Sequence, residues 1–234
     1  MGSDDLFKKR KAQKSEELER QRRERAKGPR FLIVCEGMKT EPYYFEEFCE
    51  VHQLRTPRVR IAPGEEGSSP GCVVAYAEKL FEEDAQLGPD RYDQVFCVID
   101  RDKHSTFNGA IQRISDLQGE GKPFFAIPSV PCFEYWLLLH FTYTRQAFHA
   151  KGNKSICGAV ILELRKQTGF AGYEKAQSDI YSRLKELTAT AIKHAQRAEK
   201  DAKKTGETNP STCVHHLVLQ LQQLAISHGR KRQR

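Results

Sequence analysis

Short apolar runs alternate with longer amphipathic segments through the first half of the chain. This alternation predicts strands separated by helices, and the near-continuous apolar character of the strands indicates a parallel sheet covered on both faces. The helix near 41–54 is entered through Thr40-Glu41-Pro42, a plausible cap with proline at the helix start. The predicted strands are 30–35, 57–62, 93–99 and 123–127, and the predicted helices between them are 41–54, 72–86 and 106–119.

From Pro131 onward the pattern changes to helices alone. We therefore expect an α/β protein with a mostly parallel central sheet flanked by helices and a helical C-terminal portion. The predicted helices of that portion are 132–141, 155–168, 175–203 and 211–227. The expected domains are a charged extension over 1–29, an α/β core over 30–130, a helical portion over 131–228 packed on the core, and a basic tail over 229–234.

Composition indicates a water-soluble globular protein with polar ends. Of the 234 residues, 38% are hydrophobic and 29% are charged. The longest apolar run, around Tyr135 to Phe141, is too short to span a membrane, and the polar N-terminus does not resemble a secretory signal. Seven cysteines without a C-x-x-C pair are typical of a reduced protein without a cysteine-based zinc site. We therefore expect a cytoplasmic location.

The formal net charge of +7 comes from the two ends of the chain. Residues 1–30 hold eleven Lys/Arg and six Asp/Glu, and the last five residues add four positive charges, so the body between them is about −2 by the same count. Basic ends of this kind can hold phosphate backbones without reading sequence. A solvated helix face and a disordered tail explain the same charges equally well.

Two apolar strands deliver acidic side chains at their C-terminal ends. Glu36 with Gly37 follows 31–35, and Asp100-Arg101-Asp102 follows 95–99. Residues i and i+2 of an extended segment point the same way, and ligands of open α/β sheets bind beyond the strand ends. Three carboxylates gathered there need a hard divalent cation, so the sequence predicts a Mg²⁺ or Mn²⁺ site formed by Glu36, Asp100 and Asp102. Taken alone, Glu36 is weak evidence, since strands often end in a charged residue that leaves the core, and a lone Asp-x-Asp at a strand end is more often a surface turn.

Two further charged residues are weaker candidates. Glu134 lies among aromatic and aliphatic residues, where a carboxylate is expensive unless it is paired or binds metal; the alternative is a charge on the first turn of a helix. Lys39 could contact phosphate, although a solvated charge explains it as well. The histidines show no metal-ligand spacing with cysteine, and His215 and His216, adjacent on a predicted helix, are expected to point in different directions.

The order of these motifs resembles the Toprim domain of topoisomerases, primases and related nucleases. More narrowly, the chain resembles the RloB family, which is associated with restriction loci and abortive infection. The segments that support this resemblance span 31 to about 225: Val34-Cys35-Glu36-Gly37-Met38-Lys39-Thr40-Glu41-Pro42-Tyr43-Tyr44-Phe45, Val98-Ile99-Asp100-Arg101-Asp102, Pro131-Cys132-Phe133-Glu134-Tyr135-Trp136-Leu137-Leu138-Leu139-His140 and Asn209-Pro210-Ser211-Thr212.

The resemblance implies roles for individual residues. Glu36 would be the general acid or base, Asp100 and Asp102 would hold the catalytic metal, and Glu41 and Glu134 match family positions without a defined role. It also implies antiphage defence, often beside an ATPase partner. This chain has no G-x-x-x-x-G-K-[ST] motif, so any nucleotide-driven step is expected to come from another protein.

We therefore expect Mg²⁺-dependent cleavage of phosphodiester bonds in DNA or RNA. Glu36 would manage the proton on the attacking water or the leaving oxygen, with a pKa brought toward neutrality by its acidic neighbours. Two alternatives stay open: a non-catalytic nucleic-acid or protein-binding module, and a haloacid-dehalogenase-like phosphatase. The phosphatase is disfavoured because the Asp-x-Asp motif lies on the third predicted strand, with no acidic pair downstream. Homo-oligomer formation also stays open.

Overall fold

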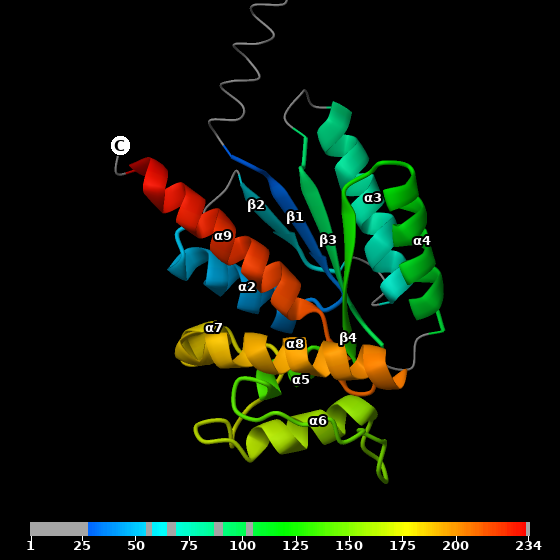
Figure 1. Ribbon diagram of the computed structural model, residues 1–234, viewed down its shortest axis with the longest axis vertical. Coiled ribbons are helices and arrows are strands. Elements are labelled where there is room, and N and C mark those ends of the chain that lie inside the picture. The colour runs from blue at the N-terminus through cyan, green and yellow to red at the C-terminus, as the bar shows by residue number, and fades with distance from the viewer. Residues whose placement is uncertain (1–27, 55–57, 65–68, 87–90, 102–104, 233–234) are drawn as a thin grey trace, which may run out of the picture.

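The computed structural model describes residues 28–54, 58–64, 69–86, 91–101 and 105–232, with side chains as far as residue 227 (Figure 1). Its centre is a five-stranded sheet in the order β2-β1-β3-β4-β5. The first four strands are parallel, and β5 is antiparallel to β4. The predicted α/β class is confirmed. The strands are β1 (Phe31–Cys35), β2 (Val59–Ala62), β3 (Gln94–Asp100), β4 (Phe124–Val130) and β5 (Ser211–Thr212).

Helices cover both faces of the sheet and the C-terminal ends of its strands. In Figure 1, α3 and α4 lie on one face, α2 and α9 lie on the other, and α5, α6 and α8 gather beyond the strand ends. No helix in these described ranges is both long enough and apolar enough to cross a membrane. The helices are α2 (Thr40–Val51), α3 (Pro70–Gln86), α4 (Phe107–Gly119), α5 (Glu134–Leu138), α6 (Ile156–Arg165), α7 (Ile180–Leu184), α8 (Thr188–Thr205) and α9 (Val214–Arg232), with a 3₁₀ turn (Lys185–Leu187) between α7 and α8.

Alternate residues of each strand enter two different apolar cores. Leu32 and Val34 pack with residues of α3 and α4, whereas Phe31, Ile33 and Cys35 pack with α2 and the C-terminal helices. Successive side chains of a strand point to opposite faces, so a strand buried on both faces shows no polar alternation. This double burial explains why β1 and β3 were visible as unbroken apolar runs. The domain boundaries expected from sequence stay predictions.

The predicted helix over 175–203 is wrong as one continuous element. It is divided into α7, the 3₁₀ turn and α8, and the chain before α7 is irregular. Long-range contacts to α2 fix this shape: the Glu47 carboxylate accepts the backbone N–H of Tyr181 at 2.7 Å, and the Thr40 hydroxyl accepts that of Ala176 at 3.1 Å. Local sequence pattern does not register such contacts.

The predicted helices 132–141 and 211–227 also need correction. The first is the short α5, and the second begins with β5 before α9 starts at Val214. Ser129 and Thr212 are Cα partners across β4 and β5, and their hydroxyl oxygens lie 3.0 Å apart in the buried edge. A two-residue strand is too short to leave a period-two pattern, so only its pairing reveals it.

The strand order reverses direction between β1 and β3. The chain passes from β1 through α2 to β2 on one side, and then through α3 to β3 on the other side of β1. Such a topological switch point opens a crevice beyond the carboxyl ends of the two strands, where α/β proteins bind ligands. Glu36 follows β1 directly and Asp100 ends β3, so both lie at the switch point.

Two glycines allow the chain to pack tightly around the end of β1. A Cβ atom on Gly37 would collide with the carboxylate of Glu41, and one on Gly64 would lie 2.5 Å from the carbonyl oxygen of Glu36. The obstacle at Gly37 is the end of a flexible side chain, but that at Gly64 is backbone. The close approach of Gly64 therefore fixes the position of Glu36.

We predict that Gly64→Ala lowers the free energy of unfolding by about 1–3 kcal/mol, because the methyl group displaces the backbone of Glu36. Urea denaturation followed by circular dichroism measures the change. Gly109→Ala is the matched control: position 109 lies in α4 with open space around its Cβ, so alanine should raise stability by about 0.5–1 kcal/mol. A Gly64→Ala protein as stable as the wild type would contradict this account of the turn.

Candidate functional site

Glu36 and Asp100 are held together at the ends of β1 and β3. The N–H of Glu36 donates to the carbonyl oxygen of Val98 at 3.0 Å, which extends the β1–β3 ladder by one residue. The N–H of Asp100 donates to Oε2 of Glu36 at 2.9 Å. Two acidic residues 64 positions apart are therefore joined directly, as their places after neighbouring strands predict.

The side chain of Asp100 is in an electrostatically unfavourable environment. Its Oδ2 accepts the N–H of Phe133 at 3.2 Å, but Oδ1 is buried and has no hydrogen-bond partner among the described residues. Burial raises the pKa of Asp100 well above its usual value, and the charges of Glu41, Glu134 and Glu36 raise it further. An unpartnered buried carboxylate oxygen is costly unless a proton or a cation is bound to it.

Glu41 and Glu134 complete a group of four acidic side chains, which we call the carboxylate cluster (Glu36, Glu41, Asp100 and Glu134). Glu41 is 6% exposed in the first turn of α2, and Glu134 is 1% exposed at the start of α5. Burial raises the pKa of Glu41 to about 7, with further contributions from Glu134 and Glu36 and an opposing one from Lys175. Sequence reasoning singled out both residues, and the structure brings both to Asp100.

Lys175 is the basic residue that the sequence analysis missed. Its Nζ lies 3.1 Å from Oε1 of Glu134, and it comes from the irregular segment between α6 and α7. Burial opposes its charge, but Glu134 more than compensates and raises the pKa of Lys175. No motif surrounds Lys175 in the sequence, so only the three-dimensional path of this segment identifies it.

The other residues of the two predicted motifs that the structure describes do not join the carboxylate cluster. Asp102 lies outside the described residues, so its expected place in the metal site stays a prediction. Lys39 is exposed at the N-cap of α2, and its carbonyl oxygen accepts the N–H of Tyr43. Arg101 turns outward, where its Nη1 donates to Oγ1 of Thr208 at 3.0 Å.

The carboxylate cluster fits a hard divalent cation. Its donors are all oxygen atoms, one of them buried and unpartnered, and Lys175 compensates at most one of the four negative charges. Oxygen donors suit Mg²⁺ and Mn²⁺ better than zinc. Asp100, Glu36 and Glu134 are the described residues that would hold such an ion at the switch point. No three carboxylates of the described cluster bring oxygen atoms within 4.8 Å of one another, so these side chains would have to move closer on binding.

The expectation for His215 and His216 is wrong. Although the residues are adjacent on α9, the Nε2 atoms of both rings approach the same oxygen of Glu199, at 3.2 and 2.9 Å. The two residues lie in the first turn of the helix, immediately after β5, where the strand sets their direction. They form a second polar cluster away from the switch point.

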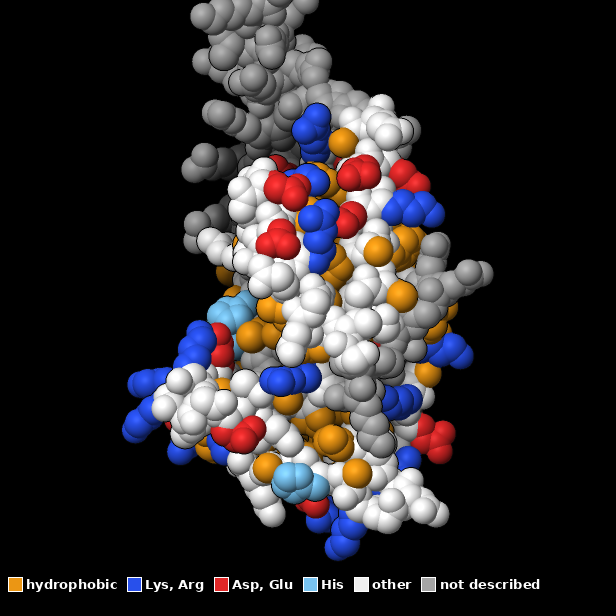
Figure 2. Space-filling model, turned by 90° about the vertical axis from the view of Figure 1, so that its right-hand side faces the viewer, with side chains coloured by type: hydrophobic (Ala, Val, Ile, Leu, Met, Phe, Trp, Pro, Cys, Tyr) orange, Lys and Arg blue, Asp and Glu red, His pale blue; other side chains and the backbone are white. Residues whose placement is uncertain are grey.

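The face formed by α3 and α4 is not uniformly charged. Figure 2 shows acidic and basic side chains interspersed from the upper part of the view to its lower edge. Ion pairs account for part of this mixture: Arg113 pairs with Glu78 at 2.6 Å, and Lys122 pairs with Glu120 at 3.0 Å. Surface pairs of this kind contribute little stability.

Comparison with known proteins identifies a family. A model described as RloB-like protein matches residues 31–221, which include β1 to β5 and nearly all of the described helices. No curated protein and no solved structure matches the chain. Because the match covers most of the sequence, the chain belongs to the RloB-like family.

Proposed function

We propose that this chain is a Mg²⁺-dependent nuclease of the Toprim type that hydrolyses phosphodiester bonds in nucleic acid. The observation that supports the proposal most directly is the buried, unpartnered Oδ1 of Asp100, surrounded by three further carboxylates where the strand order reverses. A fold stabilised only by packing has no need of such a group. A cation bound there would supply the missing partner and compensate the excess negative charge.

The residues of the cluster have separate roles in this proposal. Asp100 and Asp102 would hold the ion, which when bound neutralises charge on a phosphoryl oxygen. Glu36 would take the proton of the attacking water, or return one to the leaving oxygen, from the position in which the Asp100 N–H holds its carboxylate. Lys175 would hold the Glu134 side chain in position through their ion pair.

We further propose that the protein acts in the cytoplasm in antiphage defence by abortive infection, together with an ATPase. Membership of the RloB-like family supports this setting. Any nucleotide-driven step has to come from the partner, because the sequence lacks a phosphate-binding G-x-x-x-x-G-K-[ST] loop. The basic residues of the two chain ends would hold the nucleic-acid backbone next to the mildly acidic body.

Cleavage assays on plasmid DNA and total RNA with Mg²⁺ or Mn²⁺ test the proposal. Asp100→Asn should abolish metal-dependent cleavage of the substrate that the wild type cuts, because it removes a charged metal ligand. Asp116→Asn is the matched control, since Asp116 is an exposed carboxylate on α4 whose Oδ1 accepts a hydrogen bond from the exposed Gln112. Equal cleavage by the wild type and Asp100→Asn would overturn the assignment. Metal-dependent thermal stabilisation without cleavage would favour the non-catalytic module.

The raised pKa of Glu41 predicts a pH-dependent loss of stability without metal. Its carboxyl has a pKa of about 7 in the folded protein against about 4.5 when unfolded, so the folded state binds more protons between these values. Stability from this group is therefore complete below about pH 4.5 and is lost as the pH rises through about 7.

In metal-free buffer, Glu41→Gln should be more stable than the wild type at pH 8 by about 1–3 kcal/mol, because glutamine keeps the shape of the protonated side chain. The gain should vanish near pH 4. Urea denaturation across this range measures both, with Glu82→Gln on the exposed side of α3 as the control. If the unfolding free energies of the wild type and Glu41→Gln changed with pH in parallel, the electrostatic account would be contradicted.

A further inference from the structure

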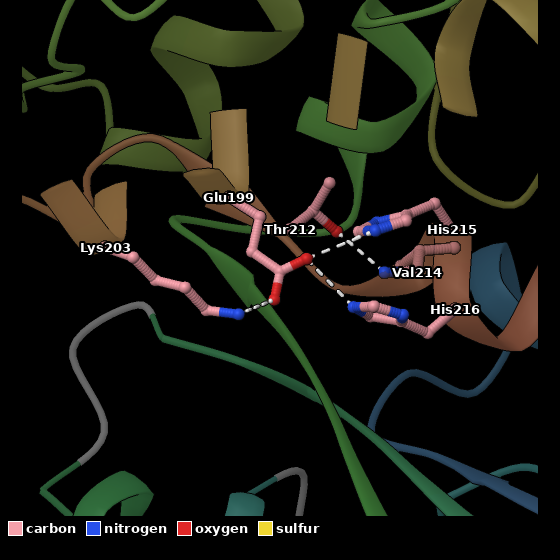
Figure 3. Close-up of polar contacts among 6 residues, drawn as sticks. All are labelled: Glu199, Lys203, Thr212, Val214, His215 and His216. Carbon is pink, nitrogen blue, oxygen red and sulfur yellow. Dashed lines mark hydrogen bonds and ion pairs between the residues drawn. The ribbon is translucent and has the colours of Figure 1, made fainter. Parts of the chain in front are cut away.

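Glu199, His215 and His216 form a compact cluster between α8 and α9, shown in Figure 3. The Nε2 atoms of His215 and His216 lie 3.2 and 2.9 Å from Oε2 of Glu199. One ligand atom from each residue lies within 4.8 Å of the other two. We call these three residues the Glu–His cluster. It shares no residue with the carboxylate cluster.

The start of α9 explains how two adjacent histidines can face one carboxylate. The Thr212 hydroxyl oxygen accepts the N–H of Val214 at 3.2 Å, and Thr212 is itself fixed to Ser129 of β4. The entry of α9 is therefore anchored to the sheet, with the imidazole ring centres 4.0 Å apart and the ring planes inclined at 36°. Both rings point toward α8 as a consequence.

Packing alone does not explain the environment of His215. It is fully buried, and neither of its ring nitrogens makes a hydrogen bond of good geometry with the described residues, although Nε2 lies 3.2 Å from Oε2 of Glu199 and the ring is close to the backbone of Thr212. Burial lowers its pKa to about 4, with a further contribution from His216, so the ring is neutral at pH 7. A neutral buried imidazole without a hydrogen bond of good geometry is costly, but its nitrogen lone pair is available to a metal ion.

Two of the three donor-atom separations within the Glu–His cluster are close to those around a tetrahedral ion, and the third is within 4.8 Å. Zinc–nitrogen and zinc–oxygen bonds of about 2.0–2.1 Å place neighbouring donor atoms roughly 3.3 Å apart. The observed separations of 3.2 and 2.9 Å from Oε2 need only small adjustments to reach that value. Lys203 pairs with the other oxygen, Oε1, at 2.7 Å and so leaves Oε2 directed at the histidines.

We propose that Glu199, His215 and His216 bind Zn²⁺ and that the ion joins α8 to α9. Two imidazole nitrogens favour zinc over Mg²⁺, which prefers oxygen ligands. Three protein donors leave a fourth position for water on the outer side of the cluster, where the His216 side chain is 52% exposed. Lys203 is 75% exposed and can move away from the added positive charge.

This site is separate from the carboxylate cluster. Asp100 is the Cα partner of Ser129, and Ser129 is the partner of Thr212, so β5 lies two strand spacings from β3. At about 4.8 Å per spacing, the anchor of α9 is roughly 10 Å from Asp100. The zinc site therefore stabilises the edge of the sheet without supplying a ligand to the proposed catalytic ion.

Spectroscopic titration of the full-length, tag-free protein with Co²⁺ tests the proposal, because Co²⁺ in a tetrahedral nitrogen and oxygen site absorbs visible light. We expect the intense absorption of tetrahedral Co²⁺ to saturate at one equivalent and to be lost when Zn²⁺ displaces the ion. His216→Ala and Glu199→Gln should weaken this binding at least tenfold. Asp100→Asn should retain it, which separates the Glu–His cluster from the carboxylate cluster. His149→Ala, at an exposed position, is the matched control.

Thermal unfolding provides a second readout that does not depend on activity. Zn²⁺ should raise the melting temperature of the wild type and of His149→Ala, and should leave that of His216→Ala unchanged, because only a folded site binds the ion. His216 is exposed, so its substitution should not prevent folding. Equal Co²⁺ spectra for the wild type and His216→Ala, or no binding to the wild type at about 100 µM metal, would overturn the proposal.

Discussion

The repulsion among four carboxyl groups at the ends of β1 and β3 is the constraint on which the rest of the site depends. Two unit charges about 4 Å apart near a protein surface repel by roughly 4 kcal/mol, so full ionisation of the carboxylate cluster would oppose folding. Lys175 offsets one charge, through Glu134. The raised pKa values of Asp100 and Glu41 reflect the same repulsion, because a carboxyl group that keeps its proton carries no charge. A bound cation would relieve this repulsion without protonation.

Independent packing on both faces of the sheet holds this unfavourable arrangement in place. The apolar core against α2 and the C-terminal helices contains fully buried aromatic residues, among them Tyr44, Phe133 and Trp136. Tyr44 and Phe133 contact edge to face, with ring centres 5.5 Å apart. These contacts tie α2 to α5, and the two helices deliver Glu41 and Glu134 to the same point. Apolar burial therefore opposes the electrostatic cost of the site.

The sequence predicts the parts of the site that follow from strand order. Glu36 and Asp100 could be found because each ends an apolar run, and parallel strands end at one edge of a sheet. Glu134 could be found because a carboxylate among aromatic residues is conspicuous. Lys175 could not, because an irregular segment positions it and nothing local distinguishes it from a surface lysine. The helix boundaries predicted after residue 131 were wrong for the same reason, because contacts with residues distant in the sequence decide where these helices begin and end.

The Glu–His cluster shows that helical periodicity does not predict side-chain directions reliably at the ends of a helix. Adjacent residues in a helix diverge by about 100°, which argues against His215 and His216 sharing a ligand. The two-residue β5 overrides this expectation because it fixes the direction of the first turn of α9 through Thr212. The same strand lies beside β4, which lies beside β3. A metal ion that joined α8 to α9 would thus hold the outer edge of the sheet that carries Asp100, and would stabilise the site from outside it.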